Sequence, residues 1–246
     1  LIHSSKELLE VVAVEQAAWG FSDQLEATPP HVMQASNRVG GLVLGAFEHE
    51  ELLGFCYTIP AFDKALKAYH HLHSLGIMPH AQDKQIGFKL LRAHQNISLE
   101  MGISKITWTF DPLESRNANL YMKKIGAIIE TPYVSNMYGD DVLGGINADI
   151  PADRLIATWY LDSPEIKQGV KTVSSLAALS SAYPIVEPES TDFPESPFLI
   201  EIPADFQKIK AVNLDEALLV RMEIREALTK VLSSDRKLIH FYSIVG

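Results

Sequence analysis

Apolar positions along residues 4–161 alternate between the spacing of amphipathic helices and the period-two spacing of strands. Ser4 and Glu7 form a capping-box pair ahead of a helical apolar pattern that ends at Gly20. Two apolar runs around a short acidic turn predict a β-hairpin. In chain order we predict helix, helix, hairpin, strand, helix, strand, helix, strand and strand, over residues 4–20, 28–40, 42–47 with 52–59, 69–78, 86–102, 106–110, 117–124, 127–136 and 155–161.

The pattern changes after residue 162. Residues 163–197 are rich in proline and serine and include an acidic stretch, which predicts a linker or wrapping segment with a short helix over 170–179. Residues 198–246 predict a β-α-β extension, with strands over 198–202 and 238–245 and a helix over 213–232. About fifty residues bury too little apolar surface to fold alone. We therefore expect the extension to dock on the main domain, residues 1–162, or on a second subunit.

The composition is that of a globular protein. Of 246 residues, 47% are hydrophobic and 21% are charged, which excludes a disordered chain. Charges interrupt every apolar run before the roughly 18 residues of a membrane span. A net charge of −10 argues against nucleic acid as a partner. The single cysteine, Cys56, excludes an intrachain disulfide and a cysteine-based zinc cluster. We expect a cytoplasmic protein without nucleic-acid or membrane partners.

The segment that points most directly to chemistry is HLHSLGIMPHAQDKQIG, residues 71–87. Its turn leads into a helix N-terminus, which presents free backbone N–H groups and a positive dipole end and so suits a pyrophosphate. The order of elements and this segment resemble the GNAT superfamily of acyl-CoA-dependent N-acyltransferases. The family's pyrophosphate turn, Arg/Gln-x-x-Gly-x-Gly/Ala, falls here on Gln82–Gly87. The resemblance implies an α/β (α+β) fold, with a mixed, splayed sheet flanked by helices, and acetyl-CoA or another acyl-CoA as the donor.

The resemblance also implies which residues hold the donor. The backbone of Leu75, Gly76 and Ile77 would bond the pantetheine arm. Asn117 would bond the pantetheine amides, or it is an N-terminal helix cap. The pyrophosphate would lie on a run of turn and helix residues: Gln82, Asp83, Lys84, Gln85, Ile86, Gly87 and Phe88.

This turn departs from the family pattern at two positions. Glycine is usual in the family where this chain has Gln85 and frequent where it has Asp83, because the backbone must approach the phosphate closely. Two like charges about 4 Å apart repel by about 1 kcal/mol in water. We therefore expect Asp83 to face solvent and Lys84 to offset its field.

His71 and His73 are candidate bases. Two residues apart on a predicted strand, they face the same side. Their spacing is similar to that of the serotonin N-acetyltransferases of this superfamily, in which paired histidines help to remove the proton of the amine. A histidine with a pKa of about 6.5 can take a proton from an ammonium, directly or through water. The alternative is a pair of hydrogen-bonded core histidines beside the cleft.

The neighbouring histidines also raise the question of a metal site. His70 and His80 lie close to His71 and His73 in the sequence. His70 faces the opposite side of the predicted strand, and no pair of carboxylates accompanies the histidines. We therefore expect no metal.

Many GNAT enzymes use a tyrosine on a later helix to protonate the departing CoA thiolate. Counting back from Gly126, that position is Met122, and Tyr121 lies one residue away, a rotation of about 100° on an α-helix. Tyr121 is therefore either the acid or a residue packed against the sheet.

Four further segments resemble sequences found in a group of GNAT-like acetyltransferases with a C-terminal extension: DPLESRNA, NMYG, NADIPADR and IEIPADF. Together the resemblances predict an N-acyltransferase, with His73 as the base and His71 behind it, that acylates an amine of a small molecule or peptide. Two alternatives stay open. One is a catalytically degenerate GNAT-fold module that binds acyl-CoA or a partner, and the other is a separate small-molecule role of the extension. GNAT relatives often pair through their last strands, and the extension adds to the case for a homodimer.

Overall fold

The computed structural model describes residues 1–21, 26–139, 148–163, 175–190 and 192–243. These residues form two compact units. The first contains Leu1–Trp108, residues 148–149 and Trp159–Asp162, and the second contains residues 109–139, Ile150–Thr158 and the described residues from Ser163 onward. The predicted domain boundaries after residues 162 and 197 stay a prediction.

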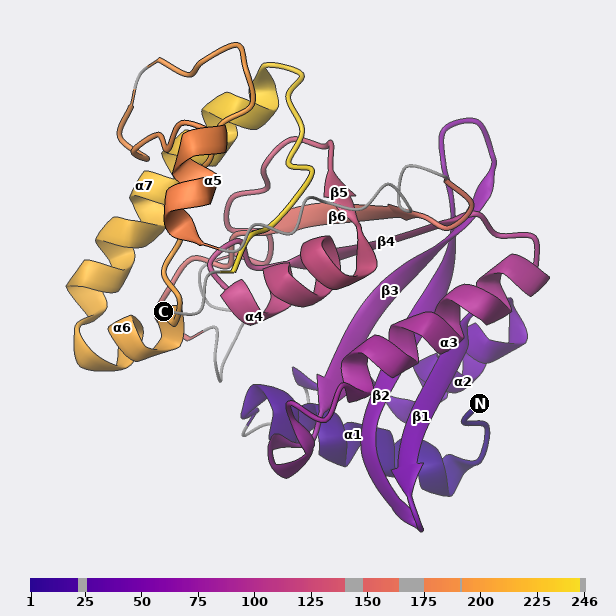
Figure 1. Ribbon diagram of the computed structural model, residues 1–246. Helices are drawn as coiled ribbons and strands as arrows, with labels where there is room; N and C mark the ends of the chain where they lie inside the picture. The colour runs from indigo at the N-terminus through magenta and orange to yellow at the C-terminus, as the bar shows by residue number, and fades with distance from the viewer. Residues whose placement is uncertain (22–25, 140–147, 164–174, 191, 244–246) are drawn as a thin grey trace. The chain divides into compact units, whose positions relative to one another are not determined.

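Six strands form a mixed sheet in the order β1-β2-β3-β4-β6-β5 (Figure 1). Neighbouring strands β1–β2, β2–β3 and β5–β6 are antiparallel, and β3–β4 is parallel. The strand bounds are β1 (Leu42–Glu48), β2 (Glu51–Phe62), β3 (Ala68–Ile77), β4 (Lys105–Phe110), β5 (Ile128–Ile129) and β6 (Leu155–Tyr160). This arrangement confirms the predicted mixed α/β class and the hairpin of β1 and β2.

Helices flank the sheet. The described helices are α1 (Ser5–Trp19), α2 (Pro30–Arg38), the short 3-10 helix η2 (Pro79–Ala81), α3 (Ile86–Glu100), α4 (Ser115–Ala118), the π-helix η3 (Asn119–Ile125), α5 (Leu176–Ala182), α6 (Phe206–Val212) and α7 (Leu214–Ser233). The predicted capping box of Ser4 and Glu7 is present at the start of α1. The helix predicted from residue 28 begins later, since Pro29 is the N-cap of α2 and the Thr28 hydroxyl donates to the Glu15 carboxylate.

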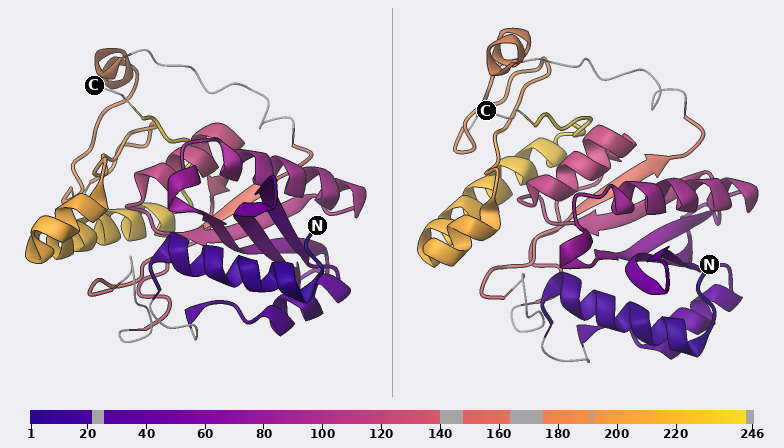
Figure 2. Two further views of the ribbon diagram at one scale, coloured as in Figure 1. Left: turned by 90° about the horizontal axis from the view of Figure 1, so that it is seen from below. Right: turned by 60° about the horizontal axis from the view of Figure 1, so that its bottom comes forward.

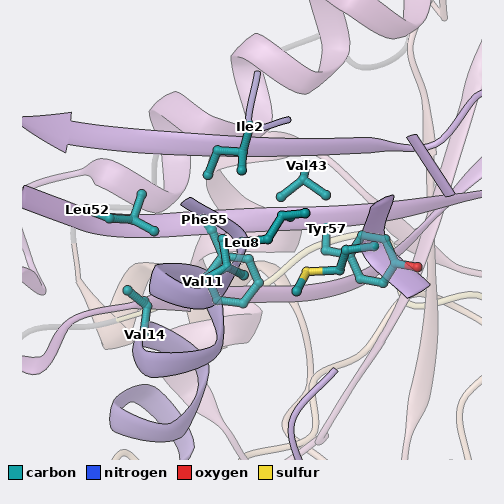
Figure 3. Close-up of a cluster of buried hydrophobic side chains, with 9 residues drawn as sticks. Ile2, Leu8, Val11, Val14, Val43, Leu52, Phe55 and Tyr57 are labelled. Carbon is teal, nitrogen blue, oxygen red and sulfur yellow. The ribbon is translucent and has the colours of Figure 1, made fainter. Parts of the chain in front are cut away.

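The core of the first unit lies between the sheet and helices α1 and α2. Figure 2 shows these two helices on one face of β1–β3 and α3 on the other. Apolar side chains of α1, α2 and the residues before α1 meet those of β1 and β2 in one buried cluster (Figure 3): Ile2, Leu8, Val11, Val14, Met33, Val43, Leu52, Phe55 and Tyr57. This packing fixes the two faces of β3, which carries the two candidate histidines and Leu75–Ile77.

The second unit differs most from the expectations. The predicted strand 127–136 shrinks to β5, followed by a single bridge between Val134 and Arg154. The predicted helix 117–124 starts earlier, at Ser115, and continues as a π-helix.

The two strands of the predicted β-α-β extension do not form within the described residues, and residues 244–245 of the second lie outside them. Within the described residues, segments 198–202 and 238–243 form only isolated bridges, Ile185–Leu199 and Ile129–Leu238, and not strands. The predicted helix 213–232 is confirmed as α7, and α6, capped by Asp205, precedes it. Within the predicted helix 170–179, residues 170–174 lie outside the described chain, and α5 begins at Leu176. None of the described helices is long and apolar enough to span a membrane.

Candidate functional site

A β-bulge on β3 sets the direction of the candidate histidines. Tyr57 of β2 is opposite Ser74, but the next residue, Thr58, is opposite Leu72, so His73 has no partner in the register. A bulge of this kind breaks the alternation of side chains. Tyr57 belongs to the core under α1, and its ring meets the His73 ring edge-on at 5.5 Å between centroids. His73 and Ser74 therefore both lie on the α1 face of the sheet.

His71 shares that face. Its Nδ1 lies 2.9 Å from Oγ1 of Thr107, its neighbour on β4. Burial lowers the pKa of His71, and the neighbouring His73 lowers this pKa further. The His73 side chain is exposed, yet the surrounding protein removes enough water to lower its pKa too. Both imidazoles are therefore neutral at neutral pH, which leaves each one ring nitrogen able to accept a proton.

His70 lies on the opposite face, against α3. Its Nε2 lies 3.0 Å from the carbonyl oxygen of Gly40, and its Nδ1 lies 2.9 Å from the Ser98 hydroxyl and 3.2 Å from Nε2 of His94. Burial lowers the pKa of His94 to about 3. His80 is exposed and pairs with Glu51. Among the described residues, no group of three or more His, Cys, Asp or Glu side chains is arranged to hold a metal ion.

After Leu72, β3 is no longer paired with the parallel strand β4 within the described residues. The pairing of β3 with β4 covers His70–Leu72 within the described chain, while β3 itself continues to Ile77. Its other edge stays paired with β2 as far as Ile77. A strand edge beyond a ladder presents backbone groups that an extended ligand can bond. Leu75, Gly76 and Ile77 lie on this stretch.

Gly76 also has a packing role. A Cβ atom at this position would lie 2.7 Å from the Phe55 ring and 2.8 Å from the Trp19 ring. The close approach of α1 to the sheet therefore requires glycine here, whatever the strand edge binds.

The turn after β3 has the left-handed backbone conformation that favours glycine, although neither of the positions concerned is a glycine. Asp83 and Gln85, the two positions where the resemblance calls for glycine, have φ angles of 65° and 61°. Residues 82–85 are all exposed. In the described structure no side chain caps the N-terminus of α3, and its first turn holds no acidic residue. The turn therefore leads to a helix end whose N–H groups and dipole favour an anion.

Two candidates lie in the second unit. Asn117 is the third residue of α4, which begins at Ser115, so the structure excludes the alternative that it is the helix N-cap. Tyr121 is buried, and its ring meets the Phe110 ring edge-on at 5.4 Å between centroids.

The π-helix changes the count that separated Tyr121 from the expected acid position. The N–H of Gly126 donates to the carbonyl oxygen of Tyr121, five residues back. A π-turn holds one residue more than an α-turn. On a regular α-helix, the residue four positions before Gly126, Met122, would point in the direction expected of the acid. On this π-turn the residue five positions before Gly126, Tyr121, points closer to that direction than Met122 does.

Sequence reasoning missed Glu15, a carboxylate only 4% exposed on α1. Its two oxygens accept hydrogen bonds from the Thr28 N–H at 2.8 Å and the Thr28 hydroxyl at 3.1 Å. Burial raises the pKa of Glu15, while the Thr28 bonds oppose that rise. A signal existed in the sequence, because Glu15 follows Val11 by four residues and so falls on the buried stripe of α1.

These features define an α/β protein in which β3 carries a neutral histidine pair on one face and leads into the uncapped N-terminus of α3. Residues 9–127 match the model of the acetyltransferase (GNAT) family. This part of the chain is therefore a GNAT acetyltransferase domain, and the family is one of transferase enzymes. A comparison with curated proteins finds no match.

Solved structures agree with the family assignment at the level of the fold. The yncA protein of Salmonella typhimurium, solved with its cofactor acetyl-CoA, has a TM-score of 0.51 at 13% identity, covering 66% of this chain and 93% of its own. The ribosomal-protein-S18-alanine N-acetyltransferase of Escherichia coli has a TM-score of 0.50 at 14% identity, covering 69% and 94%. Arabidopsis thaliana Naa50, in complex with a bisubstrate analogue, has a TM-score of 0.50 at 14% identity, covering 63% and 93%.

Proposed function

We propose that this protein transfers an acyl group, in the first instance acetyl, from acyl-CoA to an amine. The observation that carries the proposal is the turn before α3. At Asp83 and Gln85 it keeps a left-handed backbone, which costs a residue with a side chain about 1 kcal/mol or more. A strained backbone at an uncapped helix N-terminus is expected where close approach of an anion is the function.

The donor would use the residues that the resemblance implies. Its pyrophosphate would bind the backbone over Gln82–Phe88, with the exposed Lys84 offsetting the charge of Asp83. Its pantetheine arm would bond the edge of β3 at Leu75–Ile77, and Asn117 would bond the pantetheine amides. This assignment needs no metal ion.

His73 is the proposed base. Its neutral imidazole would take a proton from the ammonium of the acceptor, directly or through a water molecule. The free amine nitrogen then forms a bond to the thioester carbonyl carbon, and the carbon–sulfur bond breaks to release the CoA thiolate. As the amide forms, the nitrogen gives up its second proton to water. Tyr121 is the proposed donor of the proton to that thiolate. His71, held by Thr107, would support His73 from behind on the same face.

The acceptor is an amine of a small molecule or a peptide. Two of the similar structures, by their names, act on the alanine of a ribosomal protein or hold an analogue of a peptide joined to CoA. A net charge of −10 agrees with a cationic acceptor. A homodimer and a cytoplasmic location complete the proposal.

A second candidate is a module that binds acyl-CoA and does not transfer the acyl group. The side chains at Asp83 and Gln85 favour it, since they stand where the family carries glycine.

Release of free CoA thiol from acetyl-CoA, followed over a panel of amines and N-terminal peptides, separates the two candidates. We expect turnover with at least one acceptor class, and a loss of about a hundredfold or more in His73→Ala with unchanged acetyl-CoA affinity. His3→Ala, at an exposed histidine, is the matched control. Binding without turnover would support the module, and full turnover by His73→Ala would remove the base assignment.

A further inference from the structure

Asn117 lies on α4 and Tyr121 on η3, and the two form one continuous helix. Residues 204–243, the C-terminal segment, form hydrogen bonds to both ends of this helix. All of these contacts lie within the second unit. At the start of α4, the Gln207 side chain donates to the Glu114 carboxylate at 2.6 Å, and the Ser115 hydroxyl donates to the carbonyl oxygen of Ala204. The helix therefore begins in contact with α6 and the residues before it.

Arg221 of α7 holds the residue that shapes this start. Its side chain is 1% exposed and forms two hydrogen bonds to the Asp111 carboxylate, one of 2.8 Å from Nη1. Asp111 directly follows β4, and the same carboxylate accepts the N–H of Leu113 at 2.8 Å. Its carbonyl oxygen accepts the N–H of Glu114 at 3.1 Å. Arg221 thus fixes the turn from which α4 begins.

The far end of the helix has its own contacts with the C-terminal segment. Nζ of Lys123, in η3, donates to the Ser243 hydroxyl at 2.7 Å, and that hydroxyl lies 3.3 Å from Oδ1 of Asn119. Ile129 and Leu238, which form an isolated bridge, exchange two backbone hydrogen bonds of 2.9 Å. The helix is therefore bonded from the C-terminal segment on both sides of Tyr121.

A second arginine of α7 provides a comparison. Arg225 forms two hydrogen bonds, of 2.8 and 2.7 Å, to Asp153, which also accepts from the Tyr133 hydroxyl and the Asn136 N–H. This pair resembles the first in chemistry, but Asp153 accepts hydrogen bonds from Tyr133 and Asn136, whereas Asp111 shapes the turn of residues 111–114 from which α4 begins. The two pairs involve the segments that the sequence singled out, DPLESRNA, NMYG, NADIPADR and IEIPADF, the last through the Phe206 ring under Arg221.

We infer that Arg221 is a positioning residue for acyl transfer: through Asp111 it sets the start of α4 and hence the places of Asn117 and Tyr121. The inference rests on the proposed function, which gives those two residues their roles toward the pantetheine arm and the thiolate. It makes the C-terminal segment part of the transferase machinery. A bidentate pair is suited to this task because its planar geometry fixes direction as well as distance.

The test compares two ligands on the full chain. One is CoA, and the other is the fragment of CoA that carries the adenosine and its phosphates but lacks the pantetheine arm. For Arg221→Met we expect CoA to bind about tenfold more weakly, with the affinity for the fragment unchanged within about twofold, and kcat reduced further. Arg225→Met, the matched control, should leave the ratio of the two affinities as in the wild type.

Two gentler variants keep the inference falsifiable if Arg221→Met does not fold. Arg221→Lys keeps the positive charge but cannot form the two parallel hydrogen bonds of a guanidinium. Asp111→Asn keeps an oxygen to accept the Leu113 N–H but weakens the interaction with Arg221. Both should shift the affinity ratio in the same direction by a smaller factor. Equal weakening of CoA and fragment, or an unchanged ratio in all three variants, would overturn the positioning role. A wild-type chain that binds neither ligand would instead refute the proposed function itself.

Discussion

Asp83 and Gln85 offer a way to test whether the turn before α3 binds the pyrophosphate, because each departs from glycine for a different physical reason. Asp83 adds a negative charge, and both residues hold a left-handed backbone, with φ angles of 65° and 61°. Asp83→Asn removes the charge but keeps a residue that tolerates this conformation. Gln85→Gly removes the backbone cost and leaves the charge of the turn unchanged.

The two substitutions should therefore change different quantities, the affinity for acetyl-CoA and the free energy of unfolding. A phosphate about 4 Å from Asp83 would be repelled by about 1 kcal/mol in water and by about 4 kcal/mol at an effective dielectric of 20. Asp83 is exposed, so the lower figure applies, and Asp83→Asn should bind acetyl-CoA about fivefold more tightly. Gln85→Gly should raise the free energy of unfolding by about 1 kcal/mol, which is a rise of roughly 2–4 °C in Tm at this chain length.

Titration with acetyl-CoA at low salt and at 1 M salt is the assay, together with thermal unfolding of each variant. The gain from Asp83→Asn should shrink at high salt, where the Debye length is about 3 Å. A variant Asp83→Asn that binds no tighter than the wild type at low salt would show that the pyrophosphate does not lie on this turn. A loss of stability in Gln85→Gly would refute the account of the backbone.

Three further predictions concern the first unit. The pKa of His73 lies below its ordinary value, so kcat/KM should be constant near neutral pH and fall only below about pH 6.5; a profile with its midpoint above pH 7 would contradict the base assignment. Burial lowers the pKa values of His70 and His94, that of His94 to about 3, so their contribution to stability is complete above pH 6.5 and is lost as the pH falls toward 3. Urea unfolding should therefore show that the free energy of unfolding falls by about 1–2 kcal/mol between pH 7 and 5. An equal fall in His94→Phe would show that His94 is not its source. Glu15→Ala leaves the buried Thr28 N–H without its acceptor and should lower the free energy of unfolding by about 2 kcal/mol, whereas Glu15→Gln should cost less; equal losses in urea unfolding would contradict this reading.

The sequence pattern was a good guide to the first unit because local rules decide it. The capping box at Ser4 and the helical spacing of α3 are both present as predicted. The direction of His73 could not be obtained with the same certainty, since the bulge depends on how β3 pairs with β2, which is a long-range property. Alternation along the strand puts His71 and His73 on one side, but it does not show that Ser74 joins them.

The second unit was predicted less well because, beside the apolar periodicity that identified α7, ion pairs between residues far apart in the sequence hold its segments together. Segments 198–202 and 238–243 have the composition of strands, but each makes only one bridge among the described residues. The Arg221–Asp111 pair and the π-turn at Tyr121 join or shift residues in ways that no local pattern reports. The buried Glu15, by contrast, was open to prediction from its place on the apolar stripe of α1.

Thermal unfolding of the purified chain with and without acetyl-CoA tests the central claim most directly. A ligand present at a hundred times its Kd adds about 2.7 kcal/mol to the free energy of unfolding, which is a rise of several degrees in Tm. The account predicts such a rise with acetyl-CoA, and a smaller rise in a variant that places a second acidic residue on the turn, Gln85→Glu. An unchanged Tm at millimolar acetyl-CoA would contradict the claim that this turn and helix hold an acyl-CoA donor.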